Sequence, residues 1–182
     1  MRRKIGVIGS AEFKDAKVAA KARQIGRQIA IRNFILLTGS SSGLSHEAVK
    51  GAKDSGGFTV GVSPASSLQE HVGAYGLPTE YFDLLIFTGF GFKGRNVVLV
   101  RSCDAVVVVA GRIGTLNEFT IAYDEGRPIG VLSASGGISG SLRAIVEKSA
   151  KRGPRIVHDA DPALVVDRLT EAMREPRGRP RH

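Results

Sequence analysis

The segment 104–118 constrains the fold more than any other part of the chain. It reads DAVVVVAGRIGTLNE: a run of β-branched apolar residues, a loop with two glycines, and a helix-like stretch. This order predicts a buried strand that enters a glycine loop and then the N-terminus of a helix. That end of a helix has partial positive charge and unpaired N–H groups, so it attracts anions. Glu118 lies about one turn inside the predicted helix. The segment therefore suggests an anion site beside a single carboxylate.

Short apolar runs alternate with amphipathic stretches along the rest of the chain. Strands are predicted at 4–9, 34–38, 58–63, 84–87, 105–109, 128–132 and 156–157. Helices are predicted at 15–32, 44–55, 94–102, 115–125, 139–151 and 162–173, with a long loop at 64–82. Strands that alternate with helices form βαβ units and a parallel sheet. We predict an α/β, three-layer, doubly wound, Rossmann-like fold of about seven strands.

The chain of 182 residues is long enough for one domain with a real core, which we place at 1–173. Its net charge of +9 is concentrated at the two ends. Residues 2–4 contribute +3, and residues 174–182 contribute another +3 as a basic tail that we expect to be disordered. Because the body between them is only mildly basic, nucleic acid is not expected as a partner.

Cys103 is the single cysteine, so an intrachain disulfide is excluded. No apolar run reaches the roughly 20 residues that a membrane helix needs, and no signal-peptide core follows the basic N-terminus. We therefore expect a soluble cytoplasmic protein that does not bind membranes. No His/Cys cluster has the spacing of metal ligands, so no metal is predicted. No cofactor is expected either.

Glycines and serines gather where the predicted strands end. In open α/β sheets, ligands bind at the carboxyl ends of the strands, so these loops are the candidate phosphate or nucleotide site. The loop 39–43, GSSSG, offers N–H groups and hydroxyls together. The candidate binding residues are Gly9, Ser10, Gly39, Ser40, Ser41, Ser42, Gly43, Gly89, Gly111, Arg112, Ile113, Gly114 and Thr115.

Two sequence motifs near these candidate residues can be explained without a dinucleotide site or a catalytic role. The segment 89–94, GFGFKG, is a literal G-x-G-x-x-G, but it follows the fourth predicted strand and not the first, which argues against NAD or FAD. The segment from Thr115 to Glu118 matches a capping box, in which the threonine caps the helix and the glutamate bonds back. Capping and a functional role for Glu118 are compatible. Arg95 is either a solvated side chain or a group aimed at a phosphate.

Three blocks together resemble the LOG superfamily of Rossmann-like proteins, closest to the branch that includes molybdenum cofactor carrier proteins. The blocks are TGSSSGL at 38–44 with EAVKGA at 47–52, GRNVVLVRSCD at 94–104, and AGRIGTLNE at 110–118. The resemblance implies a homodimer or higher homo-oligomer that binds a phosphorylated small molecule. It gives no support to lysine decarboxylase activity, the family's older label.

LOG enzymes carry a P-G-G-x-G-T-x-x-E motif and an upstream arginine, and they hydrolyse nucleoside 5′-monophosphates to a free base and ribose 5-phosphate. The resemblance implies catalytic roles for Glu118, in the matching motif, and for Arg95, at the position of the arginine. Ala110 and Arg112 depart from the motif's proline and second glycine. The alternative is a carrier without turnover for molybdenum cofactor, another pterin phosphate or a nucleotide, with Arg112 as a ligand contact.

Overall fold

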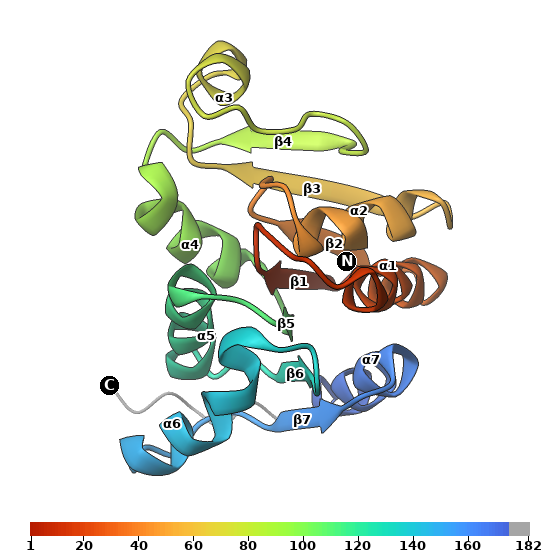
Figure 1. The fold of residues 1–182 in the computed structure, drawn as a ribbon, viewed down its shortest axis with the longest axis vertical. Helices are drawn as coiled ribbons and strands as arrows, with labels where there is room; N and C mark the ends of the chain where they lie inside the picture. Colours follow the sequence, from red (N-terminus) through yellow and green to blue (C-terminus); the bar gives the residue numbers. More distant parts are fainter. Residues whose placement is uncertain (175–182) are drawn as a thin grey trace.

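A computed structural model describes residues 1–174 and is shown in Figure 1. Apart from Arg174, the predicted basic tail at 174–182 lies outside the described residues. The described residues form one seven-stranded sheet with helices on both faces. None of the helices in this part of the chain is both long and apolar enough to span a membrane.

The sheet is parallel throughout, in the order β4-β3-β2-β1-β5-β6-β7. This confirms the predicted Rossmann-like, doubly wound α/β fold. The interior strand β5 has five fully buried residues between β1 and β6, in keeping with its β-branched run. The strands are β1 (Lys4–Gly9), β2 (Ile35–Thr38), β3 (Phe58–Ser63), β4 (Leu84–Phe87), β5 (Ala105–Val109), β6 (Ile129–Leu132) and β7 (Ile156–Asp159).

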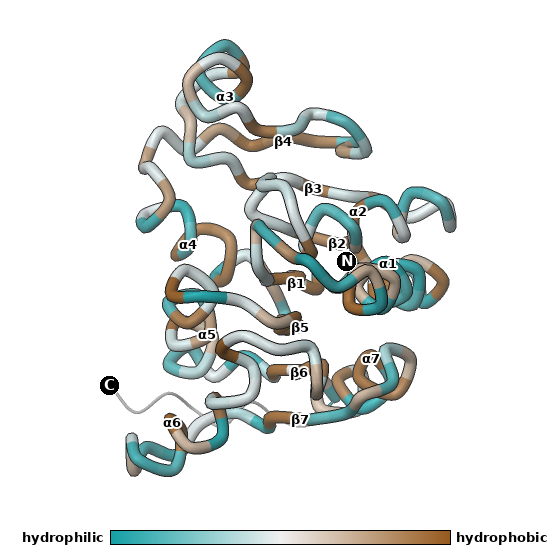
Figure 2. Tube along the Cα trace, viewed as in Figure 1, coloured by the Kyte–Doolittle hydropathy of each residue, from teal (hydrophilic) through white to brown (hydrophobic). Residues whose placement is uncertain are grey.

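The helices form two layers, and each layer covers its own core. The helices are α1 (Ala16–Ile31), α2 (Leu44–Lys53), α3 (Leu68–Gly73), α4 (Gly91–Ser102), α5 (Ile113–Asp124), α6 (Leu142–Ser149) and α7 (Pro162–Ala172), with a 3₁₀ turn η1 (Gly137–Ser141). One core packs α1, α2 and α7 on the sheet, and the other packs α4, α5 and α6. Figure 2 shows hydrophobic residues along β5 and β6, between these layers.

One helix was missed, and several helix boundaries differ from the predictions, including the predicted helix 139–151, which is η1 followed by the shorter α6. The predicted loop 64–82 contains α3, which was missed because a helix of six residues shows no clear period. Its start is fixed by Ser67, which accepts a hydrogen bond from the Glu70 N–H. Helix α4 begins at Gly91 and not at 94, and α5 begins at Ile113 and not at 115. The earlier starts of α4 and α5 mean that residues 91–93 and 113–114, predicted as loop, form the first turns of these two helices at the carboxyl edge of the sheet.

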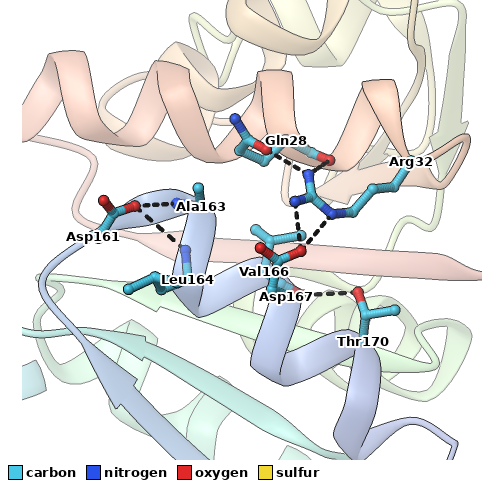
Figure 3. Close-up of polar contacts among 8 residues, drawn as sticks. All are labelled: Gln28, Arg32, Asp161, Ala163, Leu164, Val166, Asp167 and Thr170. Carbon is cyan, nitrogen blue, oxygen red and sulfur yellow. Dashed lines mark hydrogen bonds and ion pairs between the residues drawn. The ribbon is translucent and has the colours of Figure 1, made fainter.

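Helices α1 and α7 are fastened to each other beside the first core (Figure 3). Arg32 donates to the Asp167 carboxylate from Nε at 3.0 Å and from Nη2 at 2.5 Å. Asp161 caps α7 by accepting from the Ala163 and Leu164 N–H groups. The Arg32–Asp167 pair lies away from the carboxyl edge of the sheet, whereas the Asp161 cap directly follows β7 at that edge. Both sets of contacts stabilise the scaffold beside the first core.

Candidate functional site

A cavity of about 320 Å³, the first cavity, lies where β1, β2 and β5 end. Neighbouring strands β1 and β5 are followed by helices on opposite faces, α1 on one and α5 on the other. Such a switch point opens a crevice between the loops, and open α/β proteins bind ligands there. The wall of the first cavity is made by Val7, Ile8, Gly9, Ser10, Ala11, Gly39, Ser41, Ser45, Phe92, Lys93, Arg95, Asn96, Arg112, Gly114, Thr115 and Glu118.

Three helices begin at this cavity, and none of the three has a side-chain cap. Helix α2 contributes Ser45, α4 contributes Phe92 and Lys93, and α5 contributes Gly114 and Thr115. By contrast, α1, α3 and α7 begin elsewhere and are each capped by an aspartate or serine side chain. Helix α6, which continues from η1, also lacks a side-chain cap. The first cavity therefore collects uncapped helix N-termini, the groups that hydrogen-bond anions.

The capping-box interpretation of Thr115 and Glu118 is wrong. Because α5 begins at Ile113, the cap position is Arg112, and Thr115 is already the third helical residue. Glu118 is then too far along the helix to bond back to the cap. The carboxyl group of Glu118 therefore does not cap the helix, and Glu118 lines the first cavity.

Arg95 and Glu118 form a buried ion pair in that wall. Arg95 Nη1 lies 3.4 Å from Glu118 Oε1, and the two side chains are only 6% and 10% exposed. Burial raises the pKa of Glu118 to about 7, against the opposing charges of Arg95 and Lys93. Burial also lowers the pKa of Arg95, and its Nε has no hydrogen-bond partner within residues 1–174. The contact between Arg95 and Glu118 is long for a hydrogen bond, so both side chains can form further hydrogen bonds to a ligand.

Gly39 makes room for the arginine. A Cβ atom at position 39 would lie 1.5 Å from Arg95 Nη1, so the guanidinium packs directly against the glycine backbone. Phe92 lies on another side, with its ring centre 5.9 Å from the guanidinium carbon. The glycine after β2 thus fixes where Arg95 can lie in the first cavity.

The β5–α5 loop is held by the loop after β6. The Ala110 N–H donates to Ser135 Oγ at 2.8 Å, and the Ile138 N–H donates to the Gly111 carbonyl at 2.9 Å. Ala110 has φ of +53° and Gly111 has φ of +97°. A proline can neither adopt that φ nor donate that bond. The departure from the family's proline at 110 therefore coincides with a backbone that excludes proline.

Arg112 does not block the first cavity. Its φ of −126° is open to any residue, and its side chain extends at the rim, where Nη2 lies 3.1 Å from Glu12 Oε1. Arg112 and Ser10 also line a second cavity of about 250 Å³, whose wall includes Glu12. The guanidinium group of Arg112 therefore lies at the rim of the first cavity, at the position of the second glycine in the LOG motif.

The structure brings most of the predicted site residues together. Gly9, Ser10, Gly39, Ser41, Arg95, Arg112, Gly114, Thr115 and Glu118 all line the first cavity. Gly111 lines the second cavity, and Ile113 is 74% exposed. Ser40 is buried, Ser42 is exposed, Gly43 caps α2 with its backbone, and Gly89 turns beside Ser66. Ser45, Phe92 and Asn96 were missed; the correct start of α4 would have indicated Phe92.

These features define a Rossmann-like α/β protein with a crevice lined by cationic side chains at the β1/β5 switch point. Residues 2–166 match the model of the SLOG cluster4 family, and the chain belongs to that family. The predicted resemblance to the LOG superfamily, on the side of the molybdenum cofactor carriers, is confirmed.

Individual proteins support the same placement. The chain is 34% identical over 128 residues to an uncharacterized protein of Archaeoglobus fulgidus, covering 70% of this chain and 78% of that one. It is 28% identical over 177 residues to a cytokinin riboside 5′-monophosphate phosphoribohydrolase of Mycobacterium tuberculosis, covering 93% and 91%. The molybdenum cofactor carrier protein of Chlamydomonas reinhardtii matches with a TM-score of 0.77 and 27% identity, covering 96% and 100%.

Proposed function

We propose that this protein binds a phosphorylated, nucleotide-like small molecule and hydrolyses the N-glycosidic bond of nucleoside 5′-monophosphates. The observation that carries the proposal is the meeting of three uncapped helix N-termini beside the Arg95–Glu118 pair. Similarity to the M. tuberculosis phosphoribohydrolase along nearly the whole chain supports the same activity.

The charges around the first cavity suit a phosphate monoester. Lys93, Arg95 and Arg112 line it, against Glu118 as the only acidic residue in its wall. With Glu118 ionised, the wall has two more positive than negative charges, and Glu12, which pairs with Arg112 at the rim, lowers the local excess to one, so the cavity still attracts an anion. The phosphate binds the N–H groups at the start of α5, where Gly114 leaves space free of side chains.

Glu118 and Arg95 carry the chemistry in this proposal. The bond between C1′ of the ribose and the base nitrogen breaks, and its electron pair leaves with the base. The Glu118 carboxylate stabilises the oxocarbenium-like transition state and accepts a proton from the water whose oxygen adds to C1′. That proton then passes through water to the nitrogen of the departing base, so that the neutral base and ribose 5-phosphate are released and Glu118 is again a carboxylate. Arg95 orients the carboxylate and the substrate by charge-assisted hydrogen bonds.

The test is release of free base and ribose 5-phosphate from AMP and related monophosphates. We expect the wild-type protein to release base, with a rate that rises as the pH passes about 7 and Glu118 ionises. Glu118→Ala and Glu118→Gln should reduce kcat by at least about 10²-fold, the usual share of an acid–base group. Base release that is unchanged in both variants would refute the assignment.

The second candidate is a carrier of molybdenum cofactor, another pterin phosphate or a nucleotide, without turnover. Its support is the full-length match to the C. reinhardtii carrier protein, together with Arg112 at the rim of the first cavity. Mass spectrometry of the ligand that co-purifies with the protein separates the two candidates. A pterin phosphate combined with no base release favours the carrier; a nucleotide with base release favours the enzyme.

We also propose a cytoplasmic homodimer or higher homo-oligomer. Phe90, Phe92 and Val97, on and beside α4, have exposed apolar side chains, and Phe92 also lines the first cavity; a second subunit against α4 would cover them. Cys103 is free and buried, in keeping with a reducing compartment. Light scattering at micromolar concentration tests the assembly: a mass near 19 kDa would exclude it.

A further inference from the structure

Helices α4 and α5 carry two pairs of side chains that face each other in adjacent positions. Arg95 faces Glu118, and Asn96 faces Asn117, with the terminal amide atoms of the asparagines 2.9 Å apart. Asn96 is 3% exposed and lines the first cavity. A buried amide needs partners for both its ends, so its surroundings determine how it is turned.

Two acceptors surround one end of the Asn96 amide. The carbonyl oxygen of Phe92 lies 2.9 Å from that end, and Glu118 Oε1 lies 3.2 Å from it. An amide oxygen there would face two other oxygens, whereas an amide nitrogen donates to both. The amide oxygen then lies 2.9 Å from the Asn117 amide, which turns to donate to it. This arrangement gives both ends of the Asn96 amide a partner, with Asn96 donating to Glu118.

We infer that Asn96 is a positioning residue for Glu118, and that its side-chain amide fixes the rotation of the carboxylate in the site. Both Asn96 and Arg95 approach the same oxygen, Oε1. Within residues 1–174, Oε2 has no hydrogen-bond partner, so it is the oxygen left for a ligand or water. What Oε2 does there rests on the proposed function; the orientation itself does not.

A neutral donor suits this position because it favours ionised Glu118 without competing for the phosphate. Four charged or titratable groups surround Glu118. Lys93 and Arg95 belong to α4, the Cys103 thiol lies just after α4, and Arg112 lies at the rim of the first cavity. A third close cation would bind the substrate phosphate or Glu118 itself. The amide stabilises the carboxylate and leaves the cationic groups to the ligand.

The test is a ¹³C NMR titration of the Glu118 carboxyl carbon in the ligand-free protein, assigned with Glu118→Gln. We expect a midpoint near 7 in the wild type. Asn96→Leu keeps the size of the side chain but removes the donor, so the midpoint should rise by about one unit or more. Asn96→Asp, which keeps the shape, should also raise it. Asn117→Ala is the matched control, since it breaks the cross-helix pair without touching Glu118, and should move the midpoint less than half as far.

An unchanged midpoint in the folded Asn96 variants, or an equal rise in Asn117→Ala, would overturn the inference, because the pair would then only hold the helices together. A separate measurement of AMP hydrolysis distinguishes this result from the proposed function. If AMP is a substrate, the acid limb of kcat/KM should move upward by the same amount as the midpoint. If AMP is neither bound nor hydrolysed while the midpoint still rises, the proposed function fails and the positioning role stands.

Discussion

At the scale of single residues, the site depends on a carboxyl group that burial keeps partly protonated at neutral pH. Glu118 lies between two helices with one loose cationic partner, and its pKa is about 7 against 4.5 for an unperturbed side chain. A pKa raised on folding means that the folded protein holds its proton at a pH where the unfolded chain has lost it. Glu118 therefore makes stability depend on pH in a direction opposite to that of ordinary paired carboxylates.

The first prediction follows from that sign. As the pH rises from about 4.5 to about 7, the free energy of unfolding of the wild type should fall relative to that of Glu118→Gln, by up to about 3.4 kcal/mol, and then level off. Urea unfolding of both proteins at several pH values measures the difference, in which other titrating groups cancel. A difference that is constant with pH would contradict the buried, protonated carboxyl.

Gly39 gives the second prediction at this scale. In Gly39→Ala the new methyl group would displace the Arg95 guanidinium, the movable end of a long side chain, and not the backbone. We therefore expect at least about a tenfold loss of AMP affinity, with Tm lowered by no more than about 4 °C. Gly73→Ala is the control, because nothing lies near its added Cβ. A large loss of stability with unchanged affinity would show that the glycine serves the fold alone.

At the scale of elements, the anion loop depends on the loop of the next strand. Ser135 accepts the Ala110 N–H and donates to the Leu132 carbonyl at 2.6 Å, and the Ser139 N–H donates to the Ala110 carbonyl at 3.2 Å. The β5–α5 loop is thus set by β6 and η1, and not by a rigid proline of its own.

This coupling gives the third prediction. Ala110→Pro should lower the free energy of unfolding by about 3 kcal/mol or more, because proline lacks the N–H and cannot reach φ of +53°. Ser135→Ala should cost about 1–3 kcal/mol, since it leaves a buried N–H unpaired. Ala110→Gly, which accepts positive φ, should be neutral or nearly so. Thermal and urea unfolding check the order; a proline variant as stable as the wild type would show that the loop is free to adopt the family's backbone.

At the scale of the whole molecule, one sheet joins both cores, so we expect one cooperative unfolding transition. Leu169→Ala, in the core under α7, should cost about 2–5 kcal/mol. Asp167→Ala, which removes only the partly exposed pair with Arg32, should cost less than about 1 kcal/mol. Circular dichroism and tyrosine fluorescence should give the same midpoint in each variant. Two separate transitions would show that the helices of one face unfold independently of the sheet.

The sequence predicted the sheet well because the strands are short apolar runs, several of which end at glycine-containing loops. It predicted the cluster of Gly39, Arg95 and Glu118 because parallel strands deliver their following loops to one edge. The capping box failed because Ile113 and Gly114 extend α5 backward, which local spacing at Thr115 does not reveal. Asn96 was missed because its role depends on a contact between two helices, which no spacing within one helix shows.

The measurement that tests the central claim most directly is a crystal structure of the protein with AMP or ribose 5-phosphate. We expect the phosphate within hydrogen-bond distance of the Gly114 and Thr115 N–H groups, and the ribose beside Glu118. A phosphate held elsewhere, with the first cavity empty of ligand at saturating concentration, would contradict the claim that this crevice binds a phosphoryl group beside a carboxylate.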